Sequence, residues 1–230
     1  MKVKPVQFKF GDYLNGGYEL LKKDYGNFIL AYLFCVILSI VPFCGLMAMG
    51  NFYKHCKKVH HNEQANPTDI FNFDDFSTYI MLNLILIGIF IVGYIPMMFL
   101  MPGVAFLSDG NETAAGIVGL FGFIYFFAFF IAVFIIIAKA FYMPALISLR
   151  NVKDYRQAWT LSNIMTKNNL LMIILFSIVA SFLGQIGVIL CGIGLFLTAP
   201  FMYTSTYMAY DDALKQIDDD EIKEIGQNTF

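Results

Sequence analysis

Four long apolar blocks, separated by short polar segments, dominate the pattern of the chain. A membrane-spanning helix needs about 20 predominantly apolar residues, with roughly 17 as the lower limit. The blocks run from Phe28 to Tyr53, from Tyr79 to Met101, from Ala114 to Leu149 and from Leu170 to Tyr210. Each is long enough for a crossing, so the pattern predicts an all-α, polytopic membrane helix bundle.

Two of the blocks contain turn signals that affect the number of crossings. The fourth block is too long for one span and predicts a helical hairpin that turns near Cys191 and Gly192. The first block is broken by proline and glycine and leaves two interpretations open. It forms either one span over Phe28–Met49 or two short helices over Tyr25–Val41 and Phe43–Val59.

The distribution of lysine and arginine separates these two interpretations. Basic residues accumulate on the cytoplasmic side of membrane proteins. If the first block is a hairpin, the outer segments are the turn at Pro42, the loop Pro102–Thr113 and the turn Gly184–Gly194, and none contains a basic residue. A single span would instead export Lys54, Lys57 and Lys58. We therefore expect six transmembrane helices with both termini in the cytoplasm.

The whole chain is predicted to form one integral membrane domain with two amphipathic interfacial helices. In order, the expected segments are an interfacial helix at 10–25, a hairpin at 25–59, a helix at 79–101, a long helix at 114–149, an interfacial helix at 152–167, a hairpin at 169–213 and an acidic cytoplasmic tail at 214–230.

Lys139 is a charged residue within an apolar block. It lies near the end of the long helix that begins at Ala114, so we expect its side chain to reach the inner interface. The alternative is an intramembrane charge on a pathway.

An internal repeat connects the two halves of the chain. A shift of 142 residues places Asp12-Tyr13 on Asp154-Tyr155, and the same shift aligns Gly26 with Asn168. Glycine and asparagine best tolerate the left-handed conformation that stops a helix. The repeated unit is then an interfacial helix, a stop and a membrane hairpin, and both copies start inside, which predicts a parallel repeat about the membrane normal. Chance alignment of apolar helices is the alternative.

Composition and charge exclude several function classes. Hydrophobic residues make up 58% and charged residues 14% of the chain, and the net charge of −2 leaves no basic footprint for nucleic acid. No acid or histidine falls between the expected interfaces, so we predict neither an enzyme nor a bound cofactor. His55, Cys56, His60 and His61 cluster in sequence, but no further ligand at helical spacing completes a set, and we predict no metal site. We expect this segment to be a polar, cytoplasmic helix end at which Lys54, Lys57 and Lys58 face lipid phosphates.

The remaining candidates for function lie on the expected cytoplasmic face. We expect Lys22, Lys23, Arg156 and Lys167 to contact lipid head groups or a membrane or cytoplasmic protein partner. The chain would then be a non-catalytic membrane module that binds lipid or a partner. The alternative is a small permease or exporter built on the parallel repeat, which requires a polar-lined cavity between the copies.

Several short segments resemble a known group of proteins. The helix Gly17–Lys23, the stretch Asp69–Phe76, the segment Ala158–Ser162 and the run Cys191–Pro200 followed by Tyr210 resemble a family of uncharacterised bacterial multi-pass integral membrane proteins. That family is similar in style to the membrane domain of glycerophosphodiester phosphodiesterases. The resemblance implies a location in the cytoplasmic inner membrane of a bacterium. It brings no catalytic residues, because the phosphodiesterase catalytic domain has no counterpart here.

Overall fold

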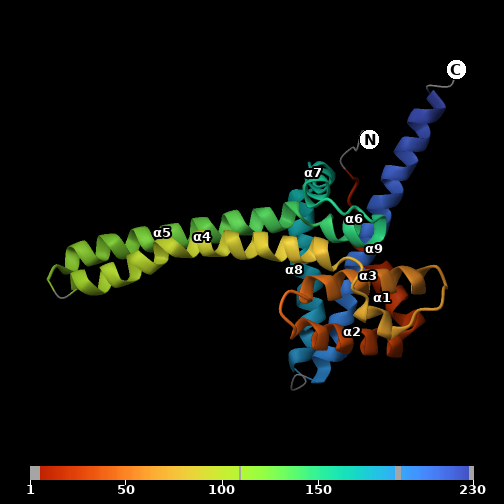
Figure 1. The fold of residues 1–230 in the computed structure, drawn as a ribbon, viewed down its shortest axis with the longest axis horizontal. Coiled ribbons are helices and arrows are strands. Elements are labelled where there is room, and N and C mark those ends of the chain that lie inside the picture. The colour runs from red at the N-terminus through yellow and green to blue at the C-terminus, as the bar shows by residue number, and fades with distance from the viewer. Residues whose placement is uncertain (1–5, 109, 190–192, 228–230) are drawn as a thin grey trace. The chain divides into compact units, whose positions relative to one another are not determined.

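The computed structural model describes the backbone of residues 6–108, 110–189 and 193–227, and in these ranges the chain is helical without strands (Figure 1). Side chains are described throughout these ranges except at 101–103, 105–108, 193 and 219–227. The elements in chain order are α1 (Phe10–Lys23), α2 (Tyr25–Ser39), α3 (Gly45–His60), the 3-10 helix η1 (Pro67–Phe71), α4 (Phe76–Ser108), α5 (Glu112–Lys139), α6 (Met143–Arg150), α7 (Tyr155–Met165), α8 (Leu170–Gln185), the 3-10 helix η2 (Ile186–Ile189) and α9 (Ile193–Gln227).

Three stretches of helix are long and apolar enough to cross a membrane. They are Phe76–Leu100, Glu112–Arg150 and Leu170–Ile189. This confirms the expected helical, membrane-compatible character of the chain. α2 is apolar but has only 15 residues, which corresponds to about 22 Å at the rise of an α-helix and is short of a bilayer core of about 30 Å. The hairpin of α2 and α3 is therefore too short for two full crossings.

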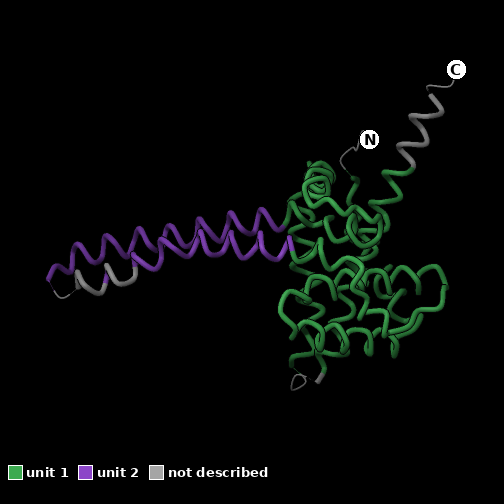
Figure 2. The backbone as a smooth tube through the Cα atoms, in the orientation of Figure 1, with its two compact units in different colours: residues 1–80, 138–230 green, residues 81–137 purple. Residues whose placement is uncertain are grey.

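The structure divides into two compact units (Figure 2). The smaller unit, residues 81–137, holds most of α4 and α5 side by side as an antiparallel hairpin. The hydroxyl of Tyr125 donates to the carbonyl of Gly93 at 2.9 Å, and Gly93 lies directly under the ring of Phe129. Large apolar side chains are exposed on this hairpin, for example Phe99 and Phe121. Such an apolar surface is suited to lipid as its solvent.

The larger unit, residues 1–80 and 138–230, contains two further helical hairpins. α2 packs on α3, where Phe28 and Phe52 are both fully buried with ring centroids 5.9 Å apart. α8 packs on α9, and Gly184 lies against Ala199 and Met202. Gly184 thus permits the close approach of α8 and α9.

α1 lies antiparallel along α9 rather than apart from the bundle. Tyr13 contacts Asp212 and Gly17 contacts Ser205, so the order along one helix reverses along the other. The apolar side of α1, which includes Leu20 and Leu21, is buried. This side of α1 is therefore covered by protein.

α7 is covered in a similar way by a different partner. Its buried residues are Ala158, Ser162 and Met165, and it packs on α6. The hydroxyl of Ser162 donates to the carbonyl of Lys139 at 2.7 Å and accepts from the amide of Tyr142 at 3.1 Å. Ser162 thereby satisfies backbone groups at the break between α5 and α6. The long helix predicted at 114–149 is thus interrupted after Lys139, and Pro144 lies in the first turn of the helix that follows.

The two predicted helix stops behave differently. Asn168 is left-handed, with a φ of 73°, and lies between α7 and α8 as expected. Gly26 lies inside α2, and the break between α1 and α2 falls at Asp24 instead. The prediction for Gly26 was wrong because Asp24, with a non-helical φ of −153° and ψ of 61°, already redirects the chain. At the other end, α9 continues to Gln227 and so includes most of the predicted tail 214–230.

Candidate anion-binding site between α3, α6 and α9

The four residues predicted to contact head groups or a partner are all exposed and lie in the larger unit. Lys22 is paired with Glu19 at 3.2 Å on the surface of α1. Lys23 donates to the carbonyl of His60 and to the side-chain oxygen of Asn62, each at 3.3 Å. The α1 pair therefore stands next to the C-terminal end of α3, although much of its hydrogen-bonding capacity is already used within the chain.

The other two predicted residues lie at opposite ends of α7. Arg156 is in its first turn and donates from Nε to the hydroxyl of Tyr155 at 3.1 Å, while Lys167 follows its last residue. An 11-residue helix is about 16 Å long, so these two charges are well separated. The structure thus presents the four residues as two surface groups and not as one cluster.

A charged pocket that we did not predict lies where the C-terminal ends of α3 and α6 meet the middle of α9. Its volume is about 270 Å³. It combines basic and acidic side chains with the uncharged side chains of Leu149, Tyr207 and Leu214. The lining residues are Lys57, His61, Leu149, Arg150, Tyr207, Asp211, Leu214, Lys215 and Asp218.

Asp211 is the centre of the hydrogen bonding on one side of this pocket. Its carboxylate is 2.6 Å from the ammonium of Lys215 and 3.6 Å from Nδ1 of His60. The hydroxyl of Tyr207 lies 3.1 Å from Nδ1 of His60 and 3.5 Å from Asp211. Burial lowers the pKa of His60 despite the nearby negative charge of Asp211. His60 is therefore mainly neutral at pH 7, and the Asp211 charge is compensated chiefly by Lys215.

Arg150 anchors the other side of the pocket. Its guanidinium forms an ion pair with Asp218 and donates to the carbonyl of Leu214 at 3.4 Å. Arg150 is the last residue of α6, whose end is fixed by the left-handed residue Asn151 with a φ of 57°. A guanidinium has five N–H donors. The two acceptors found here leave donors available for a further anion.

Of the lysines near the end of α3, Lys57 is the one directed to this pocket. We expected Lys54, Lys57 and Lys58 together to face lipid phosphates. Lys54 instead forms an ion pair with Asp75 at 2.6 Å, and Lys58 pairs with Asp69 at 2.7 Å. Within the described part of the chain, no carboxylate forms an ion pair with Lys57.

The pair formed by Lys54 belongs to a buried ion triad with a structural role. The side chain of Asp75 is only 2% exposed and also contacts the ammonium of Lys153. Burial alone would raise the pKa of Asp75, but the hydrogen bonds and charges of the two lysines outweigh it and lower the pKa. The triad joins the start of α4 to α3 and to the segment between α6 and α7.

The structure also separates the residues considered as metal ligands. His55 and Cys56 are buried, whereas His60 points to α9 and His61 is exposed with Nδ1 2.9 Å from the carbonyl of Lys57. Among the described residues, no group of three or more histidine, cysteine, aspartate or glutamate side chains converges on one point. The donor set that a structural or catalytic zinc requires is therefore not assembled in that part of the chain.

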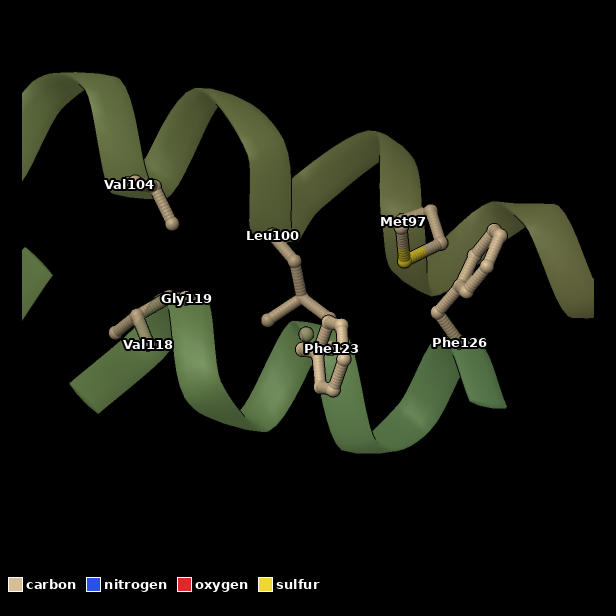
Figure 3. Close-up of a pocket in the computed structure, with 8 residues that line it drawn as sticks. Met97, Leu100, Val104, Val118, Gly119, Phe123 and Phe126 are labelled. Atoms are coloured by element: carbon tan, nitrogen blue, oxygen red, sulfur yellow. The ribbon is translucent and has the colours of Figure 1, made fainter. Parts of the chain in front are cut away.

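A pocket in the smaller unit has a different character (Figure 3). It lies between α4 and α5, has a volume of about 250 Å³ and is lined by apolar residues. Leu100 and Met97 of α4 face Phe123 and Phe126 of α5. A Cβ on Gly119 or Gly122 would come no closer than 3.9 Å to another residue, so these glycines leave space instead of packing tightly. This pocket offers shape but no polar group for chemistry.

Sequence signals for the charged pocket existed but were short. Lys57 and His61, and likewise Asp211 and Lys215, are four residues apart and share a helix face. The meeting of these pairs with Arg150 depends on contacts between segments far apart in the chain, which periodicity cannot show.

Comparisons of the chain with models of protein families, with curated proteins and with solved structures find no match.

Proposed function

We propose that this protein is a non-catalytic, multi-pass membrane module that binds anionic lipid head groups through its cytoplasmic end. The observation that carries the proposal is the closed packing of helices in the larger unit. A Cβ on Gly17 would lie 2.5 Å from the Cα of Ser205, and one on Gly50 would lie 2.3 Å from the hydroxyl of Tyr79. At these two contacts the chain leaves no room for a polar substrate to pass, which favours a binding module over a permease.

The proposed topology places both termini in the cytoplasm. It is supported by three helical hairpins, α2–α3, α4–α5 and α8–α9, each of which returns the chain to the side from which it started. The turns of these hairpins carry no lysine or arginine, whereas their open ends carry many. This argument holds for six full crossings and also for a shallower α2–α3 hairpin.

The proposed parallel repeat has support in the order of elements. A short helix, a break, an apolar helix, a turn and another helix occur as α1–α2–α3 and again as α7–α8–α9. Their packing differs, because α1 packs mainly on α9 while α7 packs mainly on α6. We therefore propose the repeat as a shared sequence origin of the two hairpins, without symmetric contacts of the short helices.

Lipid binding can be tested with the purified protein in a neutral detergent. We expect native mass spectrometry to show more retained phosphatidylglycerol than phosphatidylcholine, and the difference to shrink as salt rises. Replacing Lys22, Lys23, Arg156 and Lys167 by glutamine should weaken retention of phosphatidylglycerol at least tenfold, since each such charge contributes about 1 kcal/mol near an anionic surface.

The matched control replaces acidic residues on the same helix, Asp12→Asn with Glu19→Gln, and should leave retention unchanged or increase it. Equal retention of both lipids by the unmodified protein would contradict the proposal. Preferential capture of a cytoplasmic protein by the same four residues would assign this face to a protein partner instead.

A further inference from the structure

A second pocket lies directly beside the charged pocket. Its volume is about 150 Å³, and it is enclosed by α6, α7 and α9. Its wall is mainly aliphatic, with Arg150 and Gln157 as the polar members. The lining residues are Leu146, Arg150, Val152, Gln157, Leu161, Leu214 and Ile217.

The two pockets share two lining residues, Arg150 and Leu214. Arg150 thus stands at the boundary, with charged groups of α3 and α9 on one side and aliphatic groups of α6, α7 and α9 on the other. A site in which a cation separates a polar from an apolar compartment matches a ligand with the same division. Such a ligand is an amphiphile with an anionic head.

The charge of the polar compartment favours an anion. Lys57, Arg150 and Lys215 face Asp211 and Asp218, which leaves an excess of one positive charge even with neutral histidines. The two carboxylates are engaged by Lys215 and Arg150. Among the described residues that line this pocket, Lys57 therefore provides the uncompensated charge.

We propose that the two pockets form one binding site for a single-chain anionic amphiphile. A phosphate or carboxylate head lies against Lys57 and Arg150, and the alkyl chain enters between Leu146, Leu161 and Ile217. One chain is specified because the apolar compartment is small. The inference rests on the proposed function only in placing this end of the protein near lipid; the residues involved are different from the four surface cations.

The site can be tested with decyl phosphate, inorganic phosphate and decanol as probes of the full-length protein. We expect native mass spectrometry to detect one bound decyl phosphate, with binding at least tenfold weaker for inorganic phosphate and for decanol. If inorganic phosphate binds as well as decyl phosphate, the apolar pocket has no role in the site and the proposal is wrong. If decanol binds as well as decyl phosphate, the charged pocket has no role in the site and the proposal is also wrong.

Single substitutions locate the probe. Lys57→Gln should weaken decyl phosphate binding at least tenfold, Lys57→Arg should retain it, and Leu161→Gln should weaken it without creating phosphate binding. Lys22→Gln removes an exposed lysine outside the site and should have no effect. Thermal unfolding of each variant checks the fold, and Lys57→Arg keeps the test valid if Lys57→Gln is unstable. Unchanged binding in both Lys57→Gln and Leu161→Gln would overturn the assignment.

The quadruple variant that tests the proposed function separates the two ideas. Neutralising Lys22, Lys23, Arg156 and Lys167 should leave decyl phosphate binding intact, because none of these residues lines either pocket. Loss of decyl phosphate binding in that variant would show that the amphiphile binds to the four surface cations, and it would contradict the assignment of the binding site to the two pockets.

Discussion

The hydroxyl of Tyr13 donates a hydrogen bond of 2.6 Å to the carboxylate of Asp212, which joins α1 to α9 across 199 residues of sequence. The same carboxylate accepts from Lys9 at 2.9 Å and from Gln216 at 2.6 Å. The preceding segment continues this contact, since the amide of Gln7 donates to the side chain of Gln216 at 2.8 Å. The N-terminal segment is therefore held to α9 by a network centred on one charged acceptor.

Removing the Tyr13 hydroxyl should destabilise the larger unit. Tyr13 is 2% exposed, and hydrogen bonds to charged groups contribute about 1.5–3 kcal/mol. We expect Tyr13→Phe to lower the free energy of unfolding by about 2 kcal/mol, measured by helical circular dichroism in denaturant. Tyr18→Phe on the same helix is the control, because Tyr18 is 54% exposed and its ring contact with Lys22 survives the change. Equal effects of the two substitutions would contradict this network.

The contact between Gly17 and Ser205 should not tolerate a side chain. A Cβ at Gly17 would meet the backbone of Ser205 at 2.5 Å, which a side-chain rotation cannot relieve. We expect Gly17→Ala to destabilise the protein by about 1–3 kcal/mol, in the range of overpacked cores. Gly26→Ala should instead stabilise it by about 0.5–1 kcal/mol, because Gly26 lies inside α2 with no neighbour within 4 Å. A destabilising Gly26→Ala would show that this residue is a helix stop after all.

The buried triad around Asp75 predicts an acid-dependent stability. Because the pKa of Asp75 is lowered in the folded protein, its contribution is fully present above the ordinary value of 3.8 and is lost as the pH falls through the folded pKa. At pH 7, Asp75→Asn should cost about 1.5–3 kcal/mol, since it removes the charged acceptor of Lys54 and Lys153 while both lysines keep access to solvent. The difference between the two proteins should shrink below pH 3.8. A difference that is independent of pH would exclude this charge as the cause.

The proposed topology predicts a specific labelling pattern. In a cysteine-free background, single cysteines at Asn111 and Gln185 should react with an impermeant reagent added from outside. One at Asn62 should react only after the membrane is opened. All three positions are exposed on the surface of the protein itself, so protection reports the membrane and not burial in the fold. Labelling of residue 62 from outside would rule out the hairpin topology of α2 and α3.

Local patterns were sufficient for the helices and their turns but not for the contacts between distant segments. The apolar runs predicted α4, α5 and α8, and Asn168 identified a left-handed break. Lys54 was expected at lipid phosphates because its partner, Asp75, approaches only when the loop carrying η1 folds back on α2 and α3. The sequence patterns likewise did not predict that Arg150 and Lys215 line the same pocket. Their proximity depends on α6 leaving the line of α5.

The bond network of Ser162 at the break after Lys139 has a consequence for the order of synthesis. Before residue 162 has been made, no hydroxyl is present to bond the carbonyl of Lys139 and the amide of Tyr142. The stretch Glu112–Arg150 then emerges as 39 predominantly apolar residues without the bonds that end its first helix. A bilayer core requires only about 20 residues. The C-terminal end of α5 is therefore fixed late, when Ser162 becomes available to bond the backbone after Lys139.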